Sequence, residues 1–173
     1  QFRKTVNLAS TGTAFPNAKS SQSGNKGDVQ YKIRYRYSGD RTGEREFCNK
    51  MLNANKLYRF EDIERMGFSG VNSGFGINGA SNYDIFLYKG GPNCKHKWER
   101  ITFVKNGLEG SIDTRSPLSK TLTESQADER GMKPTGDART GQRKSETKPF
   151  DMPGRGYYNF KSIIKKLNDY ING

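Results

Sequence analysis

The sequence is poor in the residues that most often bind metals or carry out catalysis. Its 173 residues include two cysteines, one histidine and one tryptophan. A single histidine leaves few ways to build an acid–base pair, and the sequence has no nucleophile elbow, Walker A loop or acidic metal cluster. These absences predict a protein that is not an enzyme.

Long apolar runs are missing as well. No stretch reaches the roughly 18 apolar residues that a transmembrane helix needs, and residues 1–27 lack the apolar core of a secretion signal. We therefore expect a protein of cytosolic origin with no membrane span. Two cysteines in a reducing compartment are more often free thiols or metal ligands than a disulfide.

Apolar residues are scarce throughout the chain. Only 31% of the residues are hydrophobic and 20 are glycine, which is little material for a core that spans the full length. We expect one folded unit of roughly 80 residues, flanked by extended arms that become ordered on a partner. A unit of that size is small enough to need a metal or a disulfide as a staple.

Basic residues outnumber acidic ones by 30 to 18, and the resulting net charge of +12 favours an anionic partner. Residues 28–37 alternate between apolar and polar side chains, which indicates a strand with Lys32, Arg34 and Arg36 on its polar face. This basic face is either an ordinary solvated strand face or a surface for an anionic partner. In the second case the chain is a nucleic-acid-binding module, and packaged DNA is a candidate ligand.

Residues 28–105 predict a small α+β domain with an antiparallel sheet and two short helices. Apolar spacing and an acidic first turn indicate one helix over about residues 44–58. A second helix is expected over residues 60–66, where the glycine that follows suits a helix end.

The second half of this domain predicts a loop and a hairpin. Five glycines in residues 67–81 indicate a loop. Residues 83–88 and 97–104 have the composition of two strands, and the tight turn between them would carry Cys94 and His96.

The flanking segments predict an extended N-terminal arm over 1–27 and an extended linker or tail over 106–156. Residues 157–173 form an amphipathic pattern that predicts a C-terminal helix, which either packs on its own sheet or docks in the groove of a neighbour. The apolar face of this helix consists of Phe160, Ile163, Ile164, Leu167 and Ile171.

Cys48, Cys94 and His96 are the candidate metal ligands, since thiolate and imidazole are the usual ligands of structural zinc. They supply three of the four ligands of a closed tetrahedral site, so zinc, a Cys48–Cys94 disulfide and reduced buried thiols remain alternatives. A cysteine paired with His96 could also serve as nucleophile and base, which would suit a nuclease, a toxin or a maturation peptidase.

The same region contains Arg-x-Phe-Cys, then a helix with Glu-Asp-Ile, then Gly-Gly-x-Asn-Cys-x-His-x-Trp. This order resembles the C-terminal motif of the MuF-type minor head proteins of tailed bacteriophages. The Lys-Gly-Gly-Pro-Asn-Cys-x-His-x-Trp-Glu-Arg version also resembles structural proteins of Bacteroidetes-infecting, crAss-like phages. The matching residues are Arg45, Phe47, Cys48, Glu61, Asp62, Ile63, Gly90, Gly91, Asn93, Cys94, His96 and Trp98.

The resemblance covers roughly residues 31–104 and implies a structural component of a virion, assembled in the host cytoplasm. It implies that Cys48, Cys94 and His96 hold the small domain together. The expected partners are capsid, portal or connector subunits in a symmetric assembly, which the arms and the terminal helix would contact.

Overall fold

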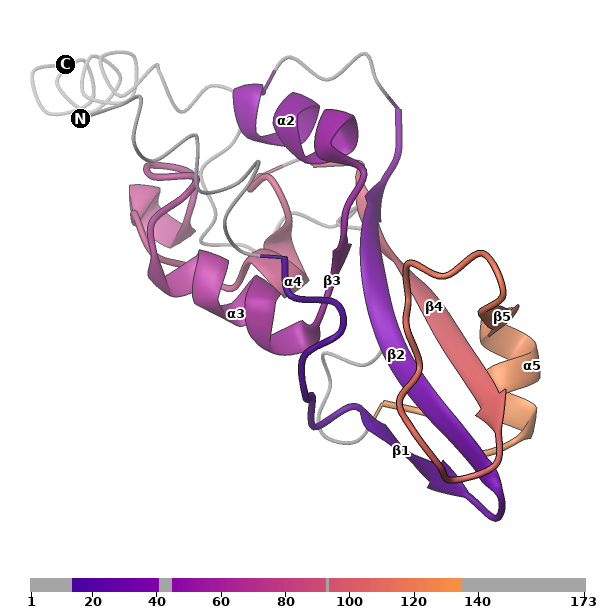
Figure 1. Cartoon of the computed structure of the whole chain (residues 1–173). Helices are drawn as coiled ribbons and strands as arrows, with labels where there is room; N and C mark the ends of the chain where they lie inside the picture. Colours follow the sequence, from indigo (N-terminus) through magenta and orange to yellow (C-terminus); the bar gives the residue numbers. More distant parts are fainter. Residues whose placement is uncertain (1–13, 41–44, 93, 135–173) are drawn as a thin grey trace, which may run out of the picture.

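Strand β2 (Val29–Ser38) is the central element of the fold. The computed structural model describes residues 14–40, 45–92 and 94–134, and the predicted C-terminal helix over 157–173 lies outside these residues. In the described part of the chain, other strands pair with β2 along both of its edges (Figure 1).

The sheet is antiparallel at every pairing. β1 (Ser23–Lys26) pairs with the first half of β2, and the two-residue β3 (Leu57–Tyr58) pairs with its second half. On the other edge, β4 (Lys97–Asn106) pairs with β2 along its whole length, and β5 (Lys120–Leu122) pairs with β4. The long β2–β4 ladder is therefore the framework to which the other elements attach.

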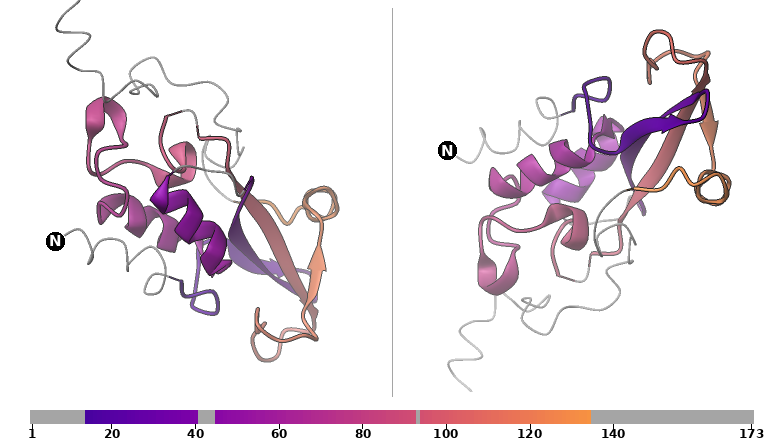
Figure 2. Two further views of the ribbon diagram at one scale, coloured as in Figure 1. Left: turned by 90° about the horizontal axis from the view of Figure 1, so that it is seen from above. Right: turned by 90° about the horizontal axis from the view of Figure 1, so that it is seen from below.

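Four α-helices accompany the sheet in the described residues: α2 (Glu46–Ala54), α3 (Phe60–Phe68), α4 (Ile85–Tyr88) and α5 (Glu124–Glu129). A short 3-10 helix, η2 (Ile77–Gly79), lies in the glycine-rich loop. Helices α2, α3 and α4 lie together on one side of the ladder, and α5 lies apart from them beside β4 and β5 (Figures 1 and 2). The predicted α+β class is confirmed, with more helices than the two expected.

The predicted helices over 44–58 and 60–66 are confirmed as α2 and α3, except that α2 ends at Ala54 and residues 57–58 form β3 instead. Asn55 caps α2, and its left-handed backbone (φ 45°) stops the helix. α3 begins at Arg59, whose backbone N–H donates to the Asp62 carboxylate at 2.9 Å. Each helix turns one apolar stripe inward, and the buried side chains of α2 are Phe47, Cys48, Met51 and Leu52.

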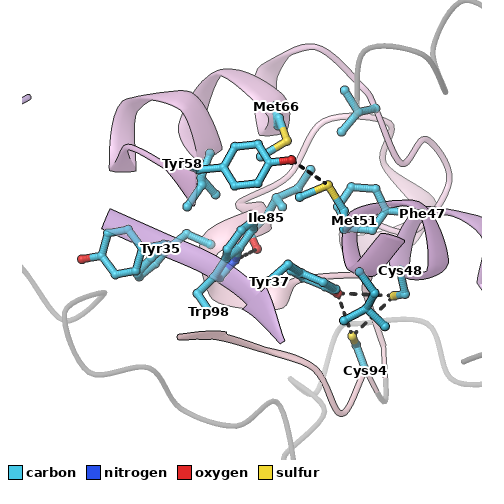
Figure 3. Close-up of a cluster of buried hydrophobic side chains, with 14 of the residues drawn as sticks. Tyr35, Tyr37, Phe47, Cys48, Met51, Tyr58, Met66, Ile85, Cys94 and Trp98 are labelled. Carbon is cyan, nitrogen blue, oxygen red and sulfur yellow. Dashed lines mark hydrogen bonds between the residues drawn. The ribbon is translucent and has the colours of Figure 1, made fainter. Parts of the chain in front are cut away.

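The core lies between these helices and the ladder. Trp98 on β4 is fully buried and meets Tyr37 and Tyr58 edge to face, with ring centroids 4.9 and 5.7 Å apart. Its indole N–H donates to the carbonyl of Ile85 at 3.1 Å, so its polar atom is satisfied. Figure 3 shows these side chains in one continuous cluster with the two cysteines at its edge.

The prediction of a strand over residues 83–88 is wrong, and so is the prediction of a hairpin that contains it. The segment instead contains α4, whose first turn is capped by the Asp84 carboxylate accepting from the Leu87 N–H at 2.9 Å. β2 occupies one edge of β4 along its whole length, and β5 occupies part of the other edge, while α4 packs against α3. Tertiary packing therefore overrides the strand propensity of this aromatic run.

The sheet draws strands from both segments that were predicted to be extended. β1 lies within the predicted arm, and β5 and α5 lie within the predicted linker, so those predictions are wrong at these elements. The second segment also contributes buried apolar side chains, namely Ile112, Ala127 and Met132. These elements are too short to show a periodic pattern in the sequence. The two strands form because the edges of the β2–β4 ladder provide them with a pairing partner.

Candidate metal centre

Cys48, Cys94 and His96 lie together at the end of β2 that is nearest α2. α2 carries Cys48, and the segment leading into β4 carries Cys94 and His96. The two Sγ atoms are 3.9 Å apart, and the Cys94 Sγ is 3.3 Å from the His96 Nδ1. All three ligand atoms lie within 4.8 Å of one another. The structure therefore brings the three predicted ligands into one site.

Tyr37 joins this group from β2. Its hydroxyl oxygen is 3.3 Å from the Cys48 Sγ and 3.4 Å from the Cys94 Sγ, and Figure 3 shows the oxygen and the two sulfurs as a triangle. Its ring stacks on the imidazole of His96, with centroids 5.2 Å apart and planes 19° apart. Tyr37 is thus the side chain that contacts all three candidate ligands.

The turn at Gly90 fits against the sulfurs because glycine has no side chain. A Cβ on Gly90 would collide with the Cys48 Sγ and lie 3.3 Å from the Cys94 Sγ. Arg45 holds this turn by donating to the carbonyls of Gly90, at 2.7 Å, and Pro92. The Gly-Gly and Arg-x-Phe-Cys parts of the motif therefore meet physically at this site.

A backbone carbonyl orients His96. The Nε2 lies 2.8 Å from the carbonyl oxygen of Asp40, and because a carbonyl can only accept, Nε2 carries the hydrogen. This leaves Nδ1 directed toward the sulfur of Cys94. Metal-bound histidines are commonly held in this way, with the second ring nitrogen donating to a carbonyl.

The thiols and the imidazole influence one another's protonation. Hydrogen bonds from Cys48 and His96 lower the pKa of Cys94, although burial opposes this. The hydrogen bond with Cys94 and burial raise the pKa of Cys48, and the contact with Cys94 raises the pKa of His96. Of the two thiols, Cys94 therefore loses its proton more readily than Cys48.

The donor set and its spacing fit zinc. With zinc–sulfur bonds of about 2.3 Å and tetrahedral angles, two bound thiolates lie about 3.8 Å apart. The observed Sγ–Sγ distance of 3.9 Å agrees with this separation. Cys48, Cys94 and His96 are exposed by only 2, 4 and 6%, so the site lies inside the domain and not on its surface.

The three cations predicted as an anion-binding face are each engaged within the protein. Arg34 is fully buried and donates to backbone carbonyls, including Pro16 and Ala18. Lys32 donates to the Ile112 carbonyl at 2.7 Å, and Arg36 pairs with the Glu99 carboxylate at 2.9 Å. The structure accounts for these side chains without an external anion.

Sequence analysis missed Tyr37, Gly90 and the carbonyl of Asp40 as parts of the site. The alternation of β2 placed Tyr37 on the core face but could not show which residues it would meet there. The predicted docking side chains of the terminal helix and the motif residue Asn93 lie outside the described residues.

Comparisons with protein-family models, with curated proteins and with solved structures gave no match to this chain. Among the helices of the described residues, none combines the length and the apolar character needed to cross a bilayer.

Proposed function

We propose that this chain is a structural component of a tailed-bacteriophage particle, at the head or near the portal, and that Cys48, Cys94 and His96 bind zinc as an internal tie. One observation carries the proposal. Residues of the Phe-Cys and Gly-Gly-x-Asn-Cys-x-His-x-Trp motifs, widely separated in the sequence, form one buried cluster around the two sulfurs.

The burial of the two sulfurs favours a structural metal site over a catalytic one. A cysteine–histidine pair that acts on a substrate needs an open approach to the sulfur, whereas these sulfurs are almost completely enclosed. A metal at this position would connect α2 to the segment before β4, next to the end of β2. It would supply cross-links that a small core otherwise lacks.

The virion assignment rests on the motif and on the composition of the chain. An excess of basic residues and a long polar C-terminal segment suit a subunit that contacts neighbouring capsid, portal or connector proteins. Such a protein would be assembled in the host cytoplasm and would occupy a repeated position in a symmetric particle.

The zinc tie is tested by elemental analysis of the purified full chain, combined with thiol titration before and after chelation. We expect about one zinc per chain, with both thiols protected until the chelator is added, because bound thiolates do not react freely. Chelation should also lower the midpoint of thermal unfolding. A metal-free chain with two reactive thiols would reject the tie.

The virion role is tested separately by mass spectrometry of purified particles of the phage that encodes the chain. We expect its peptides at a stoichiometry consistent with a head or portal position. Their absence from intact particles would reject the structural role without bearing on the metal.

A further inference from the structure

The Tyr37 hydroxyl lies against both sulfurs of the site. It is nearly equidistant from them, at 3.3 and 3.4 Å, and can donate to one sulfur and accept from the thiol of the other. Sulfur is a weak acceptor, yet the side chain is only 3% exposed. A buried hydroxyl in this setting would gain more from a stronger interaction.

The distances match those of a ligand in a tetrahedral site. If zinc binds oxygen at about 2.0 Å and sulfur at about 2.3 Å, the oxygen lies about 3.5 Å from each sulfur, and the sulfurs lie about 3.8 Å apart. The observed triangle has sides of 3.3, 3.4 and 3.9 Å. The triangle of the Tyr37 oxygen and the two sulfurs, visible in Figure 3, therefore has nearly the size of one face of a tetrahedral zinc site.

His96 lies next to Cys94, and the ligand atoms of the two cysteines and the histidine lie within 4.8 Å of one another. Its Nδ1 is 3.3 Å from the Cys94 Sγ, close to the separation of about 3.6 Å expected between bound sulfur and nitrogen. The ring of Tyr37 stacks on the imidazole, which fixes the plane of His96 relative to the hydroxyl. The Asp40 carbonyl accepts from the opposite ring nitrogen, so Nδ1, which faces the Cys94 sulfur, is the nitrogen that would bind the metal.

Two cations near the sulfurs can balance the charge of such a site. Two thiolates and a phenolate around a divalent ion leave one net negative charge, which is costly to bury alone. Lys89 is 1% exposed and interacts electrostatically with Cys94, and Arg45 interacts with Cys48. Both cations come from the segments that surround the sulfurs.

We propose that Tyr37 is the fourth ligand of the metal and binds it through its phenolate oxygen. The proposal rests on the proposed zinc tie. Binding releases the phenol proton to solvent, and the metal takes its place on the oxygen. The set of two sulfurs, one nitrogen and one oxygen would be complete within the described part of the chain, without a water ligand.

The test compares the full-length chain with Y37F, using Y58F as the matched control. Tyr58 is a buried tyrosine of the same core, and its hydroxyl contacts the sulfur of Met51 at 3.8 Å. Zinc is added to metal-free protein while the ultraviolet difference spectrum of tyrosinate is recorded. Zinc affinity is measured by competition with a chromophoric chelator, and cobalt is used as a spectroscopic probe of the ligand set.

We expect a tyrosinate signal on zinc addition in the unaltered chain and in Y58F, but not in Y37F. Zinc affinity of Y37F should fall by about 10- to 100-fold, and its cobalt spectrum should differ from those of the other two proteins. A role limited to packing would not produce tyrosinate.

Two other results would overturn the proposal. Zinc binding by the unaltered chain without a tyrosinate signal rejects Tyr37 as a ligand and leaves the tie intact. No zinc binding by the unaltered chain rejects both the tie and the fourth ligand. Because the signal is recorded on the unaltered chain, the proposal is decided even if Y37F does not fold.

Discussion

Two regions of β2 hold distant segments together by different chemistry. At the C-terminal end lies the proposed metal cluster of Tyr37, Cys48, Cys94 and His96, in which the sulfurs form weak hydrogen bonds. Near the middle of the strand, Arg34 lies in a polar layer formed by residues 14–22 and 111–114.

The polar layer depends on charge-assisted hydrogen bonds to backbone. The guanidinium of Arg34 donates to the carbonyls of Pro16, Ala18 and Ile33. From α3, the Asp62 carboxylate accepts from the Phe15 N–H at 3.0 Å. Such bonds are stronger than neutral ones and hold residues 15–18 against β2 and α3.

A second set of hydrogen bonds ties the polar layer to the loop after β4. Asn17 donates to the Asp113 carboxylate at 2.6 Å and accepts from the Thr114 N–H at 2.9 Å. The polar layer is therefore complete within the chain, whereas the proposed metal cluster needs an ion. The two regions should respond differently to mutation, chelation and pH.

Loss of the buried cation of the polar layer should have the largest effect on stability. Arg34→Met leaves several buried carbonyls without donors, and we expect the free energy of unfolding to fall by about 3 kcal/mol or more. The control is Arg36→Met on the same strand, where a half-exposed ion pair with Glu99 should cost less than about 1 kcal/mol. Chemical denaturation measures both, and equal losses would contradict the special role of Arg34.

An apolar truncation in the same layer should have the next largest effect. Ile112 is 4% exposed, so Ile112→Ala should lower the free energy of unfolding by about 2 to 3 kcal/mol through lost packing. Leu118→Ala is the control, because Leu118 is 87% exposed and should tolerate the change within about 0.5 kcal/mol. If both variants melt like the unaltered chain, residues 106–134 do not belong to the stable fold.

A methyl group added at the metal cluster should affect metal affinity more than folding. In Gly90→Ala the new Cβ would collide with the Cys48 sulfur, and we expect zinc affinity to fall about 10-fold or more. Gly107→Ala is the control, since its Cβ meets no atom within 4 Å but its φ of +84° favours glycine. That variant should lose about 1 kcal/mol of stability with unchanged zinc affinity by chelator competition.

The smallest expected effect is a pH dependence in the polar layer. Burial alone raises the pKa of Glu61, but hydrogen bonds from the N–H and hydroxyl of Ser21 outweigh it and lower the pKa below 4.5. The ionised carboxylate therefore stabilises the fold above pH 4.5, and this contribution disappears as the pH falls through the lowered pKa.

The measurement is the difference in the free energy of unfolding between the unaltered chain and Glu61→Gln as a function of pH. The difference should be constant near neutral pH and should shrink in acid. The exposed Glu109 supplies the control variant Glu109→Gln, for which little difference is expected at any pH. A Glu61→Gln difference that grows in acid would contradict the assigned sign.

The sequence by itself determined the parts of this protein that depend on local pattern or on rare residues. The extended pattern of β2 and the apolar stripes of α2 and α3 are properties of neighbouring residues, and the structure confirms the strand and both helices. Two cysteines and one histidine stood out because few such residues exist, and they do lie together.

The tertiary structure decided what depends on contacts between distant segments. The sequence pattern predicts that Arg34 is a surface cation. In the structure, residues of the N-terminal segment cover it, and it lies at the centre of the polar layer. Tyr37 reads as one of several core tyrosines, and only the β2–β4 register and the approach of α2 bring it to both sulfurs. Such contacts have no local signature, because they are set by which segments pack against each other and not by neighbouring residues.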